Sequence, residues 1–186
     1  MADLIYAAIC SLDGYIEDAS GSFEWAEPAP DVFAFINDSE RHIGTYLFGR
    51  RMYEIMTVWE TLDKEPGQDD LVVDFAHIWQ AADKIVYSTS LESVSTARTR
   101  IERSFDPDAV RELKRTLDHD IAISGPDLAS HAFRTGLVDE VHIFLLPIIV
   151  GGGKPALPAD VRLELTLTEE RRFGDGTTFL RYRKRT

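Results

Sequence analysis

The stretch IAISGPDLASHAFRTGLVDEVHIFLLPIIVGGG, residues 121–153, decides the fold. It begins with an apolar run and the turn Ser124-Gly125-Pro126, and continues with apolar residues at helical spacing up to Gly136. A glycine commonly ends a helix because it adopts positive φ without a Cβ penalty. A second, longer apolar run covers residues 141–150. Strand, turn, helix and strand of these lengths predict a βαβ crossover between parallel strands.

The turn Ser124-Gly125-Pro126 stands where such a unit usually meets its ligand, outside the carboxyl end of a strand. N–H groups in the turn and at the helix start favour phosphate. Glycine and proline also occur in such turns simply to reverse the chain. The spacing alone leaves both interpretations open.

The composition indicates one soluble domain over residues 1–186, with 44% hydrophobic and 28% charged residues. No apolar run is long enough to cross a bilayer, and no basic segment precedes the first apolar run, so residues 1–14 indicate a strand and not a signal peptide. Cys10 is the single cysteine, which excludes an internal disulfide or a multi-cysteine zinc site and fits a reducing cytoplasm. We expect a cytoplasmic protein.

The formal net charge of −12 argues against two classes of partner. A strongly acidic chain repels nucleic acid and anionic membranes at long range. Screening still allows a local basic site to bind one phosphorylated small molecule. We therefore expect a small-molecule ligand, and neither nucleic acid nor a membrane.

The N-terminal part contains a strand, a long loop and a helix. Residues 4–10 are apolar without alternation, as in a central strand covered on both faces. Residues 12–16 turn out of it, and the long loop that follows contains Trp25, which either belongs to a lid or fills the edge of the core. Asp31 opens the helix as N-cap or first-turn residue. Apolar residues up to Ile43 share one face of this helix.

Two more strands end in turns with phosphate-binding chemistry. Residues 45–48 lead into Gly49-Arg50-Arg51, and guanidinium groups at a helix start suit phosphate well, although paired surface arginines often bind nothing. Residues 84–87 lead into Ser88-Thr89, whose hydroxyls either bind phosphate or cap the turn. If these strands are neighbours of the one before Ser124, the three turns meet at one edge, where a nicotinamide dinucleotide would bridge them.

The C-terminal part is antiparallel. Residues 161–167 alternate between apolar and polar side chains, as in a half-exposed strand. Gly174-Asp175-Gly176 forms a hairpin turn before a last strand over residues 177–183. The fold class is therefore α/β, with a mostly parallel core and an antiparallel end.

Several catalytic and metal-binding motifs are absent. The segment IVGGGKPA, residues 149–156, is not a P-loop, because Ile148 and Pro155 occupy the positions of the first glycine and the Ser or Thr. There is no G-x-S-x-G, no H-E-x-x-H and no G-x-G-x-x-G. The histidines show no ligand spacing, so we expect no metal site.

Five segments carry a family resemblance: SLDGYI (11–16), FGRRMYE (48–54), Ser124-Gly125-Pro126, GLVDEVHIFLLPIIVGGGKP (136–155) and the terminal hairpin. They resemble the dihydrofolate reductase-like superfamily, and more closely the reductase domain of the bifunctional riboflavin-biosynthesis deaminase-reductase and its stand-alone relatives. The resemblance covers nearly the whole chain. It implies a three-layer α/β/α fold, a mixed sheet of about eight strands, an NADPH-dependent reductase and a homodimer that associates through the C-terminal strands.

The resemblance also implies the roles of individual residues. Residues near the nicotinamide and substrate would be Ala7, Ala8 and Ile16, with Trp25 in a mobile lid and Asp31 near the acid that serves pteridine reduction. The cofactor phosphates would be held by Gly49, Arg50, Arg51, Met52, Ser88, Thr89, Ser124, Gly125 and Pro126, with Asp127 and Leu128 following on the helix.

Two residues depart from the family pattern. Ser124 replaces a glycine, which puts the expected backbone conformation there in doubt. Asp127 stands where dihydrofolate reductases often carry a basic residue, and a carboxylate would oppose the 2′-phosphate, so NADH is possible beside NADPH. The chain has no H-x-E with P-C-x-x-C, so the deaminase half is missing.

The resemblance implies hydride transfer from NAD(P)H to a pteridine or to a compound like 5-amino-6-(5-phosphoribosylamino)uracil. Reduction of a C=N bond also needs a proton, which a half-buried Asp31 with a raised pKa would supply. A plain helix cap is the other interpretation of Asp31. The alternative for the whole protein is a non-catalytic, regulatory dinucleotide-binding module.

Overall fold

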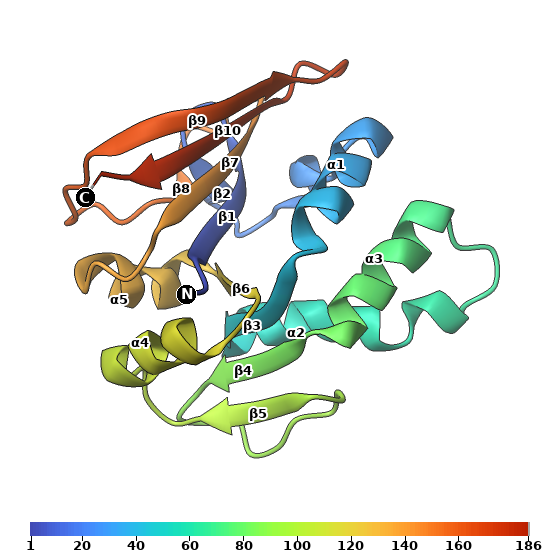
Figure 1. The fold of residues 1–186 in the computed structure, drawn as a ribbon. Coiled ribbons are helices and arrows are strands. Elements are labelled where there is room, and N and C mark those ends of the chain that lie inside the picture. Colours follow the sequence, from blue (N-terminus) through green and yellow to red (C-terminus); the bar gives the residue numbers. More distant parts are fainter. Residues whose placement is uncertain (186) are drawn as a thin grey trace.

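The structure, a computed structural model, describes residues 1–185 and contains an eight-stranded sheet in the order β5-β4-β3-β6-β1-β7-β10-β9 (Figure 1). The strands of this sheet are β1 (Leu4–Ser11), β3 (Ile43–Gly49), β4 (Asp83–Tyr87), β5 (Thr99–Glu102), β6 (Asp120–Ser124), β7 (Glu140–Leu146), β9 (Leu165–Arg172) and β10 (Thr178–Lys184). A separate two-stranded ribbon pairs β2 (Tyr15–Asp18) with β8 (Gly153–Pro155).

The predicted crossover is confirmed. Strands β6 and β7 both run parallel to β1 and flank it, so the segment between them passes over the central strand. The pairing with β6 covers Leu4–Tyr6, and the pairing with β7 continues to Ser11. Strand β10 is antiparallel to β7, and β9 is antiparallel to β10, which confirms the antiparallel C-terminal end.

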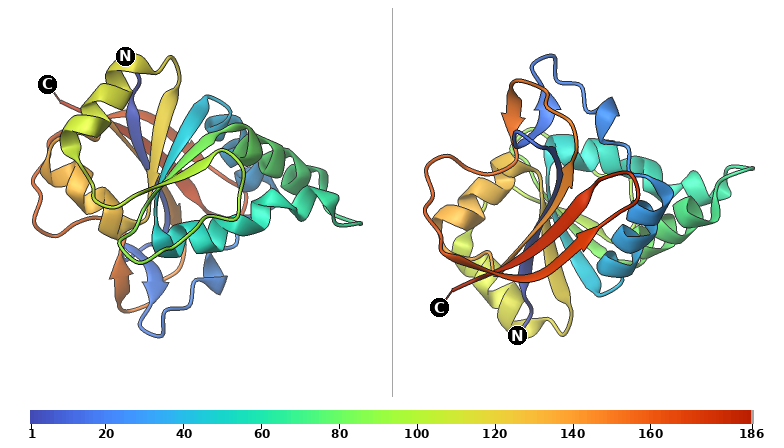
Figure 2. Two further views of the ribbon diagram at one scale, coloured as in Figure 1. Left: turned by 90° about the horizontal axis from the view of Figure 1, so that it is seen from below. Right: turned by 90° about the horizontal axis from the view of Figure 1, so that it is seen from above.

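Five α-helices of the described residues cover the two faces of the sheet (Figure 2). They are α1 (Pro30–Glu40), α2 (Arg50–Met56), α3 (Asp70–Ala81), α4 (Pro107–Thr116) and α5 (Pro126–Arg134). On one face, Val110 of α4 and Phe133 of α5 belong to the core around Leu4. On the other, Tyr53 of α2 and Trp79 of α3 pack in the core around Ile5. Successive β1 residues thus face opposite layers, as the continuous apolar run requires.

The structure corrects three sequence-based boundaries. Ile43 begins β3 and does not lie on the helix face, because α1 ends at Glu40. Residues 15–18 form β2, whose partner β8 lies more than 130 positions away and is invisible to a local pattern. Strand β9 begins at Leu165, so Val161 and Leu163 pack against the core outside any strand. No helix within residues 1–185 has the length and apolar character needed to cross a membrane.

Candidate functional site

The three predicted turns lie at one edge of the sheet. Strands β4, β3 and β6 are consecutive neighbours and parallel, so their carboxyl ends meet. The register places Gly49 beside Tyr87, and Phe48 beside Ser124. The chain leaves β3 toward β4 and leaves β6 toward β7, in opposite directions across the sheet. Such a reversal is where open α/β sheets bind their ligands.

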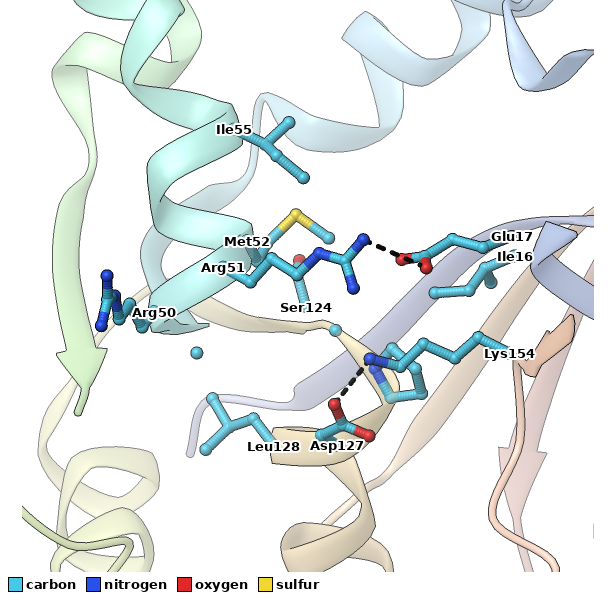
Figure 3. A pocket seen from close by; sticks show the side chains of 13 residues that line it. Ile16, Glu17, Arg50, Arg51, Met52, Ile55, Ser124, Asp127, Leu128 and Lys154 are labelled. Carbon is cyan, nitrogen blue, oxygen red and sulfur yellow. Dashed lines mark hydrogen bonds and ion pairs between the residues drawn. The ribbon is translucent and has the colours of Figure 1, made fainter. Parts of the chain in front are cut away.

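A groove of about 190 Å³ lies between the turns after β3 and β6 (Figure 3). Its walls come from the two turns, from α2 and from the β2–β8 ribbon. The lining residues are Ile16, Glu17, Gly49, Arg50, Arg51, Met52, Ile55, Ser124, Gly125, Pro126, Asp127, Leu128 and Lys154.

Gly125 is required by the backbone conformation of its turn, because the space around it would admit a side chain. It precedes α5 with φ of +89°, a conformation that a side chain rarely adopts, and a Cβ built there would lie 3.8 Å from Cβ of Met52. On the facing turn, a Cβ on Gly49 would lie 3.9 Å from Cβ of Leu128. Pro126 at the first helical position fixes the start of α5.

Charged side chains line the groove and pair across it (Figure 3). Arg51 Nη2 lies 3.3 Å from Glu17 Oε2, and Lys154 Nζ lies 2.6 Å from Asp127 Oδ2. Arg50 points away from these pairs, donating from Nε to Glu54 at 2.7 Å and from Nη1 to Ser90 Oγ at 3.0 Å. The groove therefore presents guanidinium and ammonium groups whose present partners are mostly carboxylates.

Ten of the predicted site residues line this groove, from Ile16, the turn 49–52 and the turn 124–128. The other six lie elsewhere. Ser88 and Thr89 follow β4 next to the groove, and Ser88 Oγ accepts from the N–H groups of Ser90 and Leu91. Its hydroxyl caps the turn, which was the second interpretation of this serine. Ala7 and Ala8 lie on β1, beyond Tyr6, where β6 no longer pairs with that strand.

Trp25 and Asp31 do not line the groove. The Trp25 ring is half-buried, and its Nε1 donates to the Ser22 carbonyl within the same loop. Helix α1 begins at Pro30 with Ala29 as N-cap, so Asp31 is a first-turn residue and not the cap. Its exposed carboxylate accepts from Val32 N at 3.0 Å and from Gly174 N at 3.4 Å. The half-burial on which its predicted role depends is absent.

Sequence reasoning missed Glu17, Ile55 and Lys154 as groove residues. Lys154 belongs to the segment that we set aside because it does not form a P-loop; it lies in strand β8, opposite Glu17 of β2. The signals for its place were a lysine directly after three glycines and its position in the segment 136–155, which carries the family resemblance.

Cys10 takes no part in this chemistry. It is buried in the core, and desolvation raises the pKa of its thiol to about 11. A thiol with this pKa stays protonated near neutral pH and is a poor nucleophile.

The fold and the groove define a class: a three-layer α/β protein with a charged groove at the reversal point of its sheet. The chain belongs to the RibD C-terminal domain family, whose model matches residues 2–179. Protein YyaP of Bacillus subtilis (strain 168), which is uncharacterized, is 25% identical over 174 residues that cover 92% of this chain and 89% of that protein.

Solved structures share the fold. A Shewanella sp. PV-4 protein whose name places it in riboflavin biosynthesis superposes with a TM-score of 0.74 at 20% identity, with both chains fully covered. A pyrimidine reductase-like protein of Corynebacterium diphtheriae has a TM-score of 0.64 at 18% identity, over 100% of this chain and 92% of that one. The deaminase/reductase of Thermotoga maritima has a TM-score of 0.68 at 16% identity, and 99% of this chain spans only 57% of its length.

Proposed function

We propose that the protein is a reductase that binds NADPH in the groove and transfers a hydride to a small heterocycle. One observation carries the proposal: Arg51 and Lys154 line the same groove as the turn around Gly125, at the reversal point of the sheet. Guanidinium and ammonium groups are strong phosphate ligands.

The residues present fit the diphosphate of a dinucleotide. The groove of about 190 Å³ is too small for a whole dinucleotide, since small-ligand pockets usually measure ~300–1,000 Å³, but it suits a diphosphate with its neighbouring groups. First-turn N–H groups of α5, at Asp127 and Leu128, have no acceptor within their own helix and would add hydrogen bonds. Gly125 leaves the backbone accessible, because no Cβ covers it.

Arg50 is the residue we assign to the 2′-phosphate of NADPH. It lies on the β4 side of the groove, where it contacts Ser90 in the turn that also contains Ser88 and Thr89. Asp127 does not face this turn; its carboxylate is paired with Lys154. The repulsion that would favour NADH is thus partly neutralised, and NADPH is the preferred cofactor in this proposal.

Ala7 and Ala8 are assigned to the reacting end of the site. Both are only partly buried although β1 lies at the centre of the sheet. Their small side chains leave space for a planar ring beside the strand. When bound, the reduced nicotinamide would supply the hydride, and the protein would supply orientation and a water-poor surface.

The proposed substrate class follows from the relatives. The Corynebacterium protein is named a pyrimidine reductase-like protein, and the Thermotoga protein is named for a 5-amino-6-(5-phosphoribosylamino)uracil reductase activity. We assign a pyrimidine of this kind, or a pteridine, to this chain as substrate, and riboflavin biosynthesis as the pathway.

The role of Asp31 as proton donor stays a prediction that follows from the family resemblance. The exchange Asp31→Asn should lower turnover at least tenfold and leave the Kd for NADPH unchanged. Equal turnover of the two proteins would leave Asp31 with its hydrogen bonds from Val32 N and Gly174 N as its role.

The proposal is tested by binding and turnover in one series. NADPH and NADH are titrated by fluorescence, and their oxidation is then followed at 340 nm with pyrimidine and pteridine substrates. Saturable NADPH binding with oxidation of one substrate supports the reductase. Binding without oxidation of any of them favours the non-catalytic module, and no binding rejects both.

We also propose that the protein is a homodimer that associates through β9. This strand is one of the two edge strands of the large sheet, the other being β5, and Leu167 on it is 43% exposed. An edge strand with exposed apolar residues is a template for pairing with another chain.

A further inference from the structure

The groove contains its own counterions. Three cationic side chains, of Arg50, Arg51 and Lys154, line it together with two carboxylates, of Glu17 and Asp127. Two of these cations, Arg51 and Lys154, are paired to the two carboxylates (Figure 3). A ligand with two negative charges would compete with Glu17 and Asp127 for the same two cations.

The two ion pairs connect the β2–β8 ribbon to the two sides of the groove, and the ribbon supplies the acid in one pair and the base in the other. Glu17 and Lys154 are opposite one another in the β2–β8 ribbon, so their side chains leave the same face of it. Glu17 reaches Arg51 in the turn after β3, and Lys154 reaches Asp127 in the turn after β6. The pairs therefore fasten the ribbon across the groove at two points.

The two ion pairs are weak because one member of each is exposed to solvent. The ribbon members are largely buried, with 12% of Glu17 and 26% of Lys154 exposed, but their partners Arg51 and Asp127 are 62% and 84% exposed. Ion pairs with an exposed member are screened by water and salt and stabilise little. A phosphate offers more acceptor oxygens and a higher charge to the same cations.

We infer that Glu17 and Asp127 are internal substitutes for a diphosphate: they hold Arg51 and Lys154 in place in the free protein, and the ligand's diphosphate displaces both carboxylates. This inference deepens the proposed function, because it takes the diphosphate to be that of the dinucleotide. By this inference, Glu17 and Asp127 each lower the affinity of the protein for the diphosphate ligand.

Charge-removal variants test the inference with two probes, NADPH and inorganic pyrophosphate. Glu17→Gln and Asp127→Asn should each tighten binding by about two- to fivefold, which equals ~0.4–1 kcal/mol at 1.4 kcal/mol per tenfold. Lys154→Met should weaken it about tenfold. The control Glu24→Gln removes one negative charge from an exposed residue of the same β2–α1 connection and should change neither Kd.

Double-mutant cycles separate displacement from general electrostatics. If Asp127 acts by occupying Lys154, then Asp127→Asn should have no effect on Kd in the Lys154→Met background. The same holds for Glu17→Gln in the Arg51→Met background. Thermal unfolding of each variant checks that the fold is retained.

Four results would overturn the inference. Weaker binding by the acid variants would make the pairs structural contacts that preorganise the site. A Kd equal to that of Glu24→Gln, or equal tightening of binding in the variants that lack the cations, would make the effect one of net charge. Absence of saturable pyrophosphate binding in wild type and acid variants is the fourth. If the Kd for pyrophosphate changes in the variants as expected but NADPH does not bind, the inference stands and the proposed reductase function is rejected.

Discussion

Gly153 lies directly against the backbone of Glu17, with no room between them for a side chain. A Cβ built on Gly153 would overlap the Glu17 carbonyl oxygen, and the residue has φ of +141°. The third glycine of the segment GGGK therefore serves the pairing of β8 with β2. By this pairing it places Lys154 opposite Glu17, and both side chains at the groove.

Gly153→Ala should destabilise the protein by roughly 2–4 kcal/mol, because it combines an overlap with backbone strain. Urea unfolding measures the change. The control is Gly151→Ala in the same segment, where φ is +78° but nothing lies within 4 Å of the added carbon. Gly151→Ala should lower the free energy of unfolding only by the backbone strain, about 1 kcal/mol. Equal losses would show that the close approach to Glu17 has no energetic weight.

Arg50 should discriminate between the two nicotinamide cofactors. A charge-assisted hydrogen bond contributes ~1.5–3 kcal/mol, so Arg50→Gln should raise the Kd for NADPH about tenfold or more. NADH lacks the 2′-phosphate, and its Kd should change less than twofold. Fluorescence titration gives both values. Arg100→Gln is the matched control, because Arg100 is equally exposed, at 54% against 52%, and lies on β5. A parallel loss for both cofactors would contradict the assignment.

Residues 121–153 predict the centre of the fold because their information is local. The apolar runs, the turn and the helix spacing lie within 33 residues, and the structure forms β6, α5 and β7 from them. The start of α4 is also local: Asp106 accepts from Asp108 N at 2.9 Å, and Pro107 is the first helical residue. Capping chemistry needs only neighbouring residues, so sequence alone reveals it.

Two of the three missed groove residues owe their place to a nonlocal pairing. Glu17 and Lys154 meet only because β2 pairs with β8, and a two-strand ribbon of three to four residues per strand leaves no periodic pattern.

Ser88 shows a second limit of prediction from sequence, which is the ambiguity of a residue type. Its residue type fits both phosphate binding and turn capping, of which capping is the commoner use, and the structure shows that its hydroxyl accepts from Ser90 and Leu91.

Leu167→Asp should convert the proposed dimer to a monomer, because it places a charge on the exposed edge strand. Size-exclusion chromatography with light scattering measures the mass, which is 21.0 kDa for one chain. Leu157→Asp serves as control: Leu157 is 47% exposed, similar to Leu167 at 43%, and lies outside β9. A wild-type monomer, or a dimer that survives Leu167→Asp, would rule out association through β9.

Acid stability should depend on Glu140. Its carboxylate accepts from His142 Nε2 at 2.9 Å and from Arg183 Nη1 at 2.6 Å, and the bond to His142, followed by that to Arg183, lowers its pKa to about 2. A carboxyl with a lower pKa in the folded state stabilises the protein above its ordinary pKa of 4.5, and this contribution is lost as the pH falls toward 2. Glu140→Gln should cost roughly 2–3 kcal/mol at pH 7 and progressively less below pH 4.5.

Glu40 should show the opposite sign in the same experiment. Desolvation raises the pKa of its carboxyl to about 7, despite a 2.8 Å hydrogen bond from Tyr46 Oη. A carboxyl whose pKa is higher in the folded state contributes stability below pH 4.5 and loses it as the pH rises through 7. Relative to wild type, Glu40→Gln should therefore become more stable between pH 4.5 and 8, by roughly 1–3 kcal/mol. Urea unfolding at several pH values gives both profiles, and a pH-independent difference for either variant would show that its carboxyl titrates alike in the folded and unfolded chain.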